Sequence, residues 1–309
     1  MKHSITLLMT LSTVLFADIL HVPSEYSDIF SAIGAAQDGD TVLVAPGQYN
    51  GGFSFQGKNI VVMSSGSAYN TFIRSPFPVY HGVMFTGGED STAVLDGFSI
   101  SNVNFDGSYP ADQGYVDKGG GIFIENSSPT VRNCVITNCI AGSGGGLYMK
   151  NSSMRIVDCE FSDNEACVHG GGLFIGNSDS GNPPEIIGCT ITGNDAQYGG
   201  GLRLWGDTAV VINNTISGND ASGISISHTN TLICGNLISG NSASGIRINS
   251  GKAHVIGNMI VENEAGYGGG IYEASGGNLT MRNNTVAYNS ASQGGGIRSS
   301  RDSISFINM

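Results

Sequence analysis

Basic residues are scarce in this sequence of 309 residues, and charge is sparse in general. Lysine and arginine number 13 against 25 aspartates and glutamates, so the formal net charge is -12, and only 12% of residues are charged. Binding along nucleic-acid phosphates needs a dense basic stripe, so this composition argues against a nucleic-acid partner. Charge-driven disorder is also disfavoured, because 40% of residues are hydrophobic and can form a core.

Several familiar signatures are also missing. None of the six cysteines forms a CxxC pair or a zinc-like spacing with histidine. The 47 glycines follow no three-residue period, which excludes collagen. Beyond the N-terminus, no apolar run is long enough for a transmembrane segment, so we expect none in this chain.

The N-terminus carries one short apolar run. Leu7 to Phe16 follows Lys2 and precedes Ala17, which predicts a signal peptide at residues 1–17. No cysteine comes directly after it, which argues against a lipoprotein anchor. We therefore expect a secreted, periplasmic or cell-surface protein.

A phrase of about 25 residues recurs along the rest of the chain. Its anchor is a β-branched or aromatic residue, with spacings of 25, 30, 25, 22, 22 and 26 at Ile136, Phe161, Ile191, Ile216, Ile238, Ile260 and Val286. Three residues later comes Asn in all but the first copy, which has Cys139, and five residues later comes Ala in every copy. A period in this range is typical of a solenoid, in which an interior Asn can bond to the next coil.

Each repeat reads as three short strands separated by turn residues. Ile246–Asn249, Ala253–Ile256 and Met259–Val261 form one such set, with Gly, Asn or Ser between the pieces. Most repeats also carry three successive glycines, as at 144–146 and 170–172, which allow corners with positive φ. We therefore predict stacked β coils.

The pattern resembles the right-handed parallel β-helix of pectate-lyase-like proteins over residues 60–309. Phe161-Ser162-Asp163-Asn164 followed by Gly170-Gly171-Gly172-Leu173 is also similar to the FxxN and GGA(I/L) repeats of chlamydial polymorphic outer-membrane proteins, with Gly in place of Ala. The resemblance implies an all-β, right-handed parallel β-helix solenoid.

The two ends of the repeat region differ from its middle. Ser27 or Asp28 is predicted to cap a helix that runs through Ala36, so residues 18–59 would form an N-terminal cap with the first strands. At the other end, Ile304 begins a further coil that stops at Met309. We therefore expect a truncated chain whose C-terminal anchor, translocator or sorting domain is missing.

Strand alternation predicts which residues face outward. In the strand after each glycine cluster, the first and third residues should point inward and the second and fourth outward. The outward positions predict a ligand-binding stripe made of Phe123, Tyr148, Lys150, Phe174, Arg203, Trp205, Arg247, Tyr272 and Arg298. Exposed aromatic rings stack on sugars and arginine binds carboxylates, although aromatic residues also simply favour strands.

Other columns carry chemistry of their own. Acids follow several ladder asparagines, and Asp195 and Asp220 are candidate calcium ligands, against the alternative of a solvated acidic edge. Cys134, Cys159 and Cys189 occupy one repeat position, either as buried thiols or as bridged neighbours. Beyond calcium we expect no cofactor.

Three functions remain open. The first is a monomeric β-helix that binds a polysaccharide or cell-surface ligand through the stripe, as an adhesin would, without catalysis. The second is a polysaccharide lyase acting on uronates, with a base among Lys118, His169 and Arg203. The third is a structural stalk that binds nothing.

Overall fold

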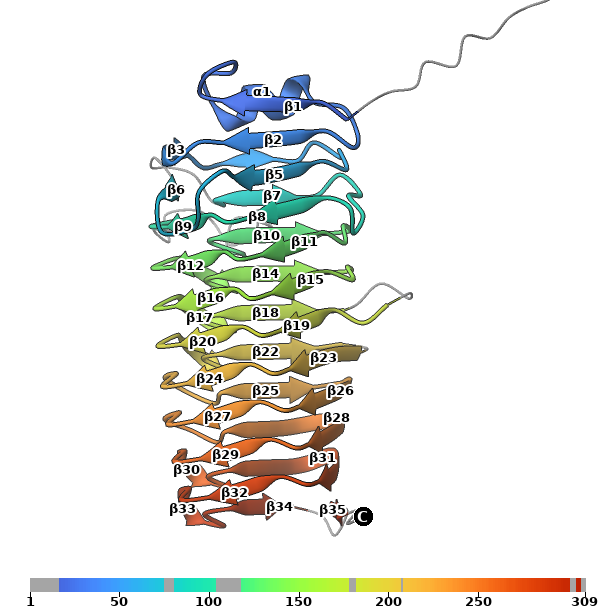
Figure 1. The fold of residues 1–309 in the computed structure, drawn as a ribbon. Helices are drawn as coiled ribbons and strands as arrows, with labels where there is room; N and C mark the ends of the chain where they lie inside the picture. Colours follow the sequence, from blue (N-terminus) through green and yellow to red (C-terminus); the bar gives the residue numbers. More distant parts are fainter. Residues whose placement is uncertain are drawn as a thin grey trace, which may run out of the picture.

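The computed structural model describes residues 17–74, 81–103, 118–177, 182–206, 208–300 and 304–306. The predicted signal peptide lies outside the described residues except for Ala17. The described chain winds into a right-handed parallel β-helix, with coils stacked from the N-terminal to the C-terminal end (Figure 1). The predicted fold class is confirmed.

Three columns of strands form the walls of the solenoid, and all strand pairings given for the described residues are parallel. The first wall holds the strands that follow the glycine clusters and is called the glycine-side sheet. It consists of β4 (Phe53–Ser54), β7 (Val83–Phe85), β10 (Ile122–Glu125), β14 (Leu147–Lys150), β18 (Leu173–Gly176), β22 (Leu202–Trp205), β25 (Ile224–Ser227), the first parts of β28 (Ile246–Ile256) and β31 (Ile271–Arg282), and β34 (Ile297–Ser299).

The second wall continues from the first, since β28 and β31 run through both. Its other strands are β1 (Ile19–Val22), β2 (Thr41–Val44), β5 (Val61–Ser64), β8 (Val94–Asp96), β11 (Thr130–Arg132), β15 (Arg155–Val157), β19 (Glu185–Ile187), β23 (Thr208–Ile212), β26 (Thr229–Cys234) and β35 (Ile304–Phe306).

The third wall is a sheet of 10 strands that carries the repeat anchors. It consists of β3 (Gly47–Asn50), β6 (Thr71–Arg74), β9 (Ser99–Ser101), β12 (Val135–Thr137), β16 (Glu160–Ser162), β20 (Thr190–Thr192), β24 (Thr215–Ser217), β27 (Leu237–Ser239), β29 (Met259–Val261) and β32 (Thr285–Ala287). Short corner strands lead from it back to the glycines: β13 (Ile140–Ser143), β17 (Glu165–His169), β21 (Asp195–Tyr198), β30 (Glu264–Tyr267) and β33 (Ser290–Gln293).

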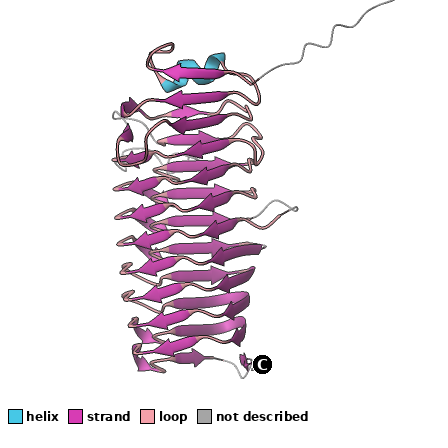
Figure 2. Cartoon of the chain, viewed as in Figure 1, coloured by secondary structure: helices cyan, strands magenta, loops and turns pink. Residues whose placement is uncertain are grey.

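One helix, α1 (Ile29–Ala35), covers the N-terminal end of the stack (Figure 2). Asp28 is its N-cap, and its carboxylate accepts a hydrogen bond from the Ser31 N–H at 2.7 Å. Ile29, Ala32 and Ile33 are buried against the first coil. The predicted capping helix is therefore confirmed, with Asp28 rather than Ser27 as the cap. Within the described residues, no helix is long and apolar enough to cross a bilayer.

The predicted repeat register is confirmed. Ile136 pairs with Phe161, which pairs in turn with Ile191, so the anchors are vertical neighbours. The alanine column behaves in the same way, with Ala166 paired to Ala141 and to Ala196. The inward residues of the glycine-side sheet, such as Ile122, are buried in one continuous core.

The glycine triples do more than turn the chain. Only the first glycine of a triple, such as Gly170 with φ of 63°, has the left-handed backbone that we expected of these corners. At the third position, a Cβ on Gly172 would lie 2.6 Å from the carbonyl oxygen of Gly201 in the next coil. Glycine is needed there because the coils approach too closely for a side chain.

A column of interior asparagines joins one coil to the next. Its members, the asparagine ladder, are Asn164, Asn194, Asn219, Asn241, Asn263 and Asn289. The Oδ1 of Asn219 accepts bonds from the backbone N–H and the side-chain N–H of Asn194, at 3.1 and 3.0 Å. The Asn219 amide donates in turn to the Ile191 carbonyl at 3.1 Å. Each amide thereby satisfies buried polar groups of the neighbouring coils.

We predict that Asn219→Ala lowers the free energy of unfolding by roughly 3 kcal/mol or more, because several buried donors and acceptors lose their partner at 1–3 kcal/mol each. Urea unfolding followed by circular dichroism measures this change. Asn230→Ala, at an exposed position of β26, is the control and should change stability by less than about 0.5 kcal/mol. Equal losses in both variants would show that the ladder does not stabilise the stack.

Candidate functional site

The predicted stripe exists as a vertical row on the outer side of the glycine-side sheet. Phe123 pairs with Tyr148, Tyr148 with Phe174 and Phe174 with Arg203. The row continues beyond these residues through Ser225, Arg247, Tyr272 and Arg298. These positions lie on one face of the glycine-side sheet, as strand alternation predicted, and their binding of a ligand stays a prediction.

The expectation that the whole stripe is exposed is wrong. Phe123, Tyr148 and Phe174 are only 3%, 6% and 9% exposed, although they point away from the core. Their rings stack nearly parallel, with centroids 5.6 and 5.0 Å apart, so each ring covers the next. This outer aromatic stack is closed at its N-terminal end by His81, whose ring lies 4.7 Å from that of Phe123.

The stack ends in a hollow of about 240 Å³. The residues that line it come from β14, β17, β18 and β22 and the turns beside them: Tyr148, Lys150, His169, Phe174, Gly176, Asn177 and Trp205. Trp205 is 41% exposed, and its side chain forms one edge of the hollow. The hollow therefore combines an accessible indole with a few polar groups, an arrangement typical of small-ligand sites.

His169 lies between aromatic rings at this hollow. The ring centroids of Phe174, Tyr198 and Trp205 are 5.9, 5.5 and 5.8 Å from its own. Its Nδ1 is buried and has no hydrogen-bond partner among the described residues. Burial, and then the positive charge of Arg203, lower the pKa of His169 below its ordinary value of 6.5. The imidazole is consequently neutral near pH 7.

Arg203 lies over the ring of Trp205 and is only 4% exposed. Its guanidinium carbon is 5.3 Å from the Trp205 ring centroid and 5.9 Å from that of Tyr198. Burial, with the positive charge of Arg247 beside it, lowers the pKa of Arg203 to about 10. The side chain still carries its charge at neutral pH, in a site largely shielded from water.

The three residues predicted for lyase chemistry are only partly brought together. His169 and Arg203 are close enough for the charge of one to shift the pKa of the other. Lys118 pairs with Ser143, which pairs with His169, so Lys118 lies two coils away and contacts the Tyr148 ring. The hollow instead contains Lys150, which we had placed in the binding stripe.

The structure places two more residues at this site, Tyr198 and His228, which the sequence analysis did not identify. Tyr198 contacts both His169 and Arg203, and the His228 ring lies 5.9 Å from that of Trp205. Tyr198 occupies the position directly before a glycine triple, as do His169 and Lys118. That shared position was the signal that could have identified it, whereas His228 has no such repeat position.

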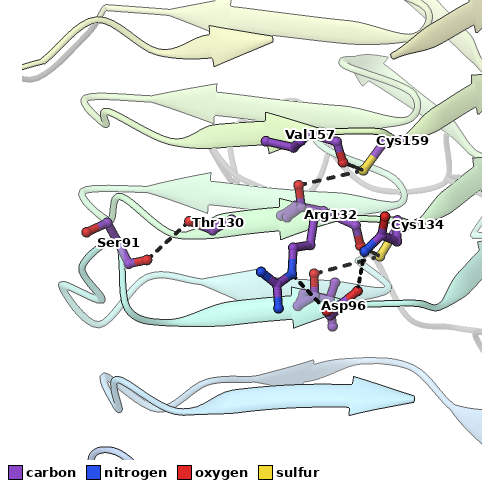
Figure 3. A network of polar contacts seen from close by, with 10 residues as sticks. Ser91, Asp96, Thr130, Arg132, Cys134, Val157 and Cys159 are labelled. Carbon is purple, nitrogen blue, oxygen red and sulfur yellow. Dashed lines mark hydrogen bonds and ion pairs between the residues drawn. The ribbon is translucent and has the colours of Figure 1, made fainter. Parts of the chain in front are cut away.

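A larger groove of about 570 Å³ lies on another corner of the solenoid, where the second wall turns into the third. Figure 3 shows Cys134 and Cys159 there on successive coils, beside the ion pair of Arg132 with Asp96 at 2.8 Å. Both thiols donate to carbonyls of their own coils, Cys134 to Arg132 at 3.2 Å and Cys159 to Val157 at 3.3 Å. The stacked cysteines are free and buried rather than bridged.

A comparison with protein-family models finds one match, over residues 105–297, to the family described as periplasmic copper-binding protein (NosD). The match covers more than half of the chain. The chain belongs to the NosD family. Comparison with curated proteins finds no match.

Solved structures similar to this NosD-family chain include a pectate lyase, whose likeness concerns the fold alone. Pectate lyase Pel9A superposes with a TM-score of 0.55 at 14% identity, over 89% of this chain and 78% of that one. Pectin methylesterase PemA from Erwinia chrysanthemi gives a TM-score of 0.47 at 10% identity, over 96% of this chain and 94% of that one. The A-module of mannuronan C-5 epimerase AlgE6 from Azotobacter vinelandii gives 0.41 at 14% identity, over 92% and 96%.

The family description implies copper, but the described residues do not fit it. Nowhere in the described ranges are three or more His, Cys, Asp or Glu side chains gathered so that they could hold a metal ion. Copper(I) favours thiolates, whereas burial raises the pKa of Cys139 to about 12 and that of Cys159 well above its ordinary value of 9. These two thiols are protonated and bonded to carbonyls, whereas the hydrogen bond with Cys159 lowers the pKa of Cys189.

The predicted calcium residues lie in a column of acids that, within the described ranges, is not gathered into a group that could hold a metal ion. Asp195 pairs with Glu165 on one side and Asp220 on the other. Burial, then the charges of Asp220 and Glu165, raise the pKa of Asp195 above 3.8. Ser242 donates a hydrogen bond to Asp220 at 2.6 Å and interrupts the acidic column. Calcium binding at Asp195 and Asp220 stays a prediction.

We predict that, in the reduced native protein, Cys167 reacts fastest with a thiol reagent such as Ellman's, because it is the exposed cysteine. Cys234 should react more slowly, and the four buried thiols only after denaturation, when all six become available. Timed absorbance at 412 nm counts the reactive groups. Cys167→Ser is the control and should abolish the fast phase; three or more fast thiols would contradict the buried column.

Proposed function

We propose that this chain is a periplasmic or cell-surface β-helix protein that binds a glycan along its glycine-side sheet. The observation that carries this proposal is the hollow at the end of the outer aromatic stack, with half-buried Lys150 on one side and the indole of Trp205 on the other. An accessible indole offers a flat apolar surface to the C–H face of a sugar ring, and its N–H remains available to a hydroxyl group.

The architecture supports an extended ligand. Equivalent residues of neighbouring coils lie about 4.8 Å apart, so side chains at one position form a straight row. On the C-terminal side of the hollow, the row contains Arg247 and Tyr272, whose guanidinium and ring are 5.4 Å apart. Tyr267 and Arg298 form a similar pair at 4.4 Å. These pairs provide further contacts for a chain of sugars along the row.

We predict that Trp205→Ala weakens glycan binding at least about tenfold, a loss of about 1.4 kcal/mol. A glycan array with the mature protein identifies a ligand, and isothermal titration calorimetry then compares the variants. Tyr288→Ala is the matched control, because Tyr288 is 86% exposed and lies in the bend directly after β32, away from the glycine-side sheet. Equal affinity in both variants would move the site away from the hollow, and a blank array would leave the chain as a stalk.

A polysaccharide lyase is the second candidate, favoured by neutral His169 next to the positive charge of Arg203. In this reaction the imidazole removes the C5 proton of a uronate and the C4–O bond breaks. A C4=C5 double bond forms, and the departing oxygen takes a proton from water. Arg203 would stabilise the negative charge that develops on the carboxylate side.

The lyase candidate predicts a particular pH dependence. Because burial and Arg203 lower the pKa of His169, the base form persists below pH 6.5, and activity should fall only as pH drops through that lowered pKa. Arg203→Gln removes one cause of the shift and should move the acid limb up toward pH 6.5. Absorbance of the unsaturated product from pectate or alginate measures the rate; no increase with the unmodified protein would eliminate the lyase.

A further inference from the structure

Two arginines on the glycine-side sheet are joined by a small polar network. Arg203 donates to the Ser225 hydroxyl at 2.6 Å and to the Ser227 hydroxyl at 2.9 Å. Two coils from Arg203, Arg247 donates to the Asn249 side-chain oxygen at 2.9 Å. The Asn249 amide lies 3.5 and 3.4 Å from the two serine hydroxyls. We call Arg203, Ser225, Ser227, Arg247 and Asn249 the arginine cradle.

The cradle has two positive charges and no carboxylate partner. The ion pairs of the described residues join Arg132 with Asp96 and Arg155 with Glu185, both on the second wall. The charged group that acts most on the pKa of Arg203 is Arg247, which lowers it. Burying a charge without an opposite charge is costly. Among the residues that the structure describes, neither arginine of the cradle forms an ion pair with an Asp or Glu.

The hydrogen bonds within the cradle leave guanidinium N–H groups of both arginines without a partner among the described residues. The Nε of Arg203 is buried and has no partner among the described residues. Arg247 and Asn249 are half-buried, so the outer side of the cradle is open to solvent. Trp205, 5.3 Å from the Arg203 guanidinium, connects the cradle to the hollow. A sugar stacked on this indole would bring its ring substituents to the arginines.

We propose that the arginine cradle is the subsite for the carboxylate of a uronic acid unit in an acidic glycan. The inference rests on the proposed function and specifies the class of glycan. A planar guanidinium forms two parallel hydrogen bonds with a carboxylate, and the carboxylate provides the negative charge that the two guanidiniums lack. A sulfate ester shares the anionic oxygens but not the planar shape, so the two sources can be separated by experiment.

The chain provides its own probe for the test, because Trp205 is its single tryptophan. Indole fluorescence is titrated with oligogalacturonate and oligomannuronate as carboxylates, a neutral galacto-oligosaccharide, and a sulfated galactan. We expect the carboxylated glycans to bind more tightly than the neutral one, and this advantage to shrink as salt is added. Loss of a charge-assisted hydrogen bond in Arg247→Gln should weaken carboxylate binding by roughly tenfold to a hundredfold and weaken neutral binding much less, because a neutral glycan loses a contact but no opposite charge.

Arg247 is the residue to change first, because it is half-buried whereas Arg203 is packed under two rings. Arg155→Gln is the matched control: the same substitution at an exposed arginine of the second wall, with no expected effect on binding. Urea midpoints of both variants confirm that the stack is intact.

The outcomes separate the two proposals. Binding of neutral and carboxylated glycans with equal affinity, or no effect of Arg247→Gln, would overturn the cradle and leave the glycan site at Trp205 in place. Tighter binding of the sulfated galactan would overturn the assignment to a carboxylate. Failure of every glycan on the array as well as in the titration would overturn the proposed function together with the cradle.

Discussion

Parallel hydrogen bonding between coils, in nearly unbroken register, is the constraint on which the rest of the structure depends. A flattened coil has three short strands and little core of its own, so it is stable only when the next coil satisfies its backbone. The glycine triples allow the coils to approach closely at one corner. At the turn where strand pairing is interrupted, the asparagine ladder forms the hydrogen bonds that satisfy the backbone. Both features place equivalent residues directly above one another.

Stacking has opposite effects on different side chains. Aromatic rings gain from it, and Phe123, Tyr148 and Phe174 close over one another until little of each is exposed. Carboxylates are disfavoured by it: burial, and then the charges of the acids on either side, raise the pKa of Asp195. The proposed site lies where the stack of aromatic rings ends. Beyond Phe174 the row changes to arginine and serine, and the indole of Trp205 beside it stays accessible.

The fold by itself leaves the function open. Membership of the NosD family and the likeness to pectate lyase Pel9A concern the solenoid, which a family described as copper-binding and a pectate lyase share. Burial raises the pKa of the Cys159 thiol, which disfavours the thiolate that copper(I) prefers, and this thiol is bonded to a carbonyl. The functional argument therefore depends on Trp205, His169 and the arginine cradle rather than on the architecture.

Three features could be predicted from the amino-acid order alone: the solenoid, the alternation of inward and outward residues, and the columns of Asn, Ala and Gly. These follow from a local period, because a stack repeats the same short-range choices in every coil. The row from Phe123 to Arg298 could be predicted for the same reason. The sequence could not show which members of that row are buried, or that Tyr198 and His228 reach the same place.

The burial of the row and the meeting of Tyr198 and His228 at one site depend on contacts between coils. Exposure depends on how neighbouring side chains cover one another, and pKa values depend on charges from other coils, neither of which has a period that can be read along the chain. The hollow, the neutral His169 and the absence of a carboxylate near Arg203 in the described chain all arise from such cross-coil distances.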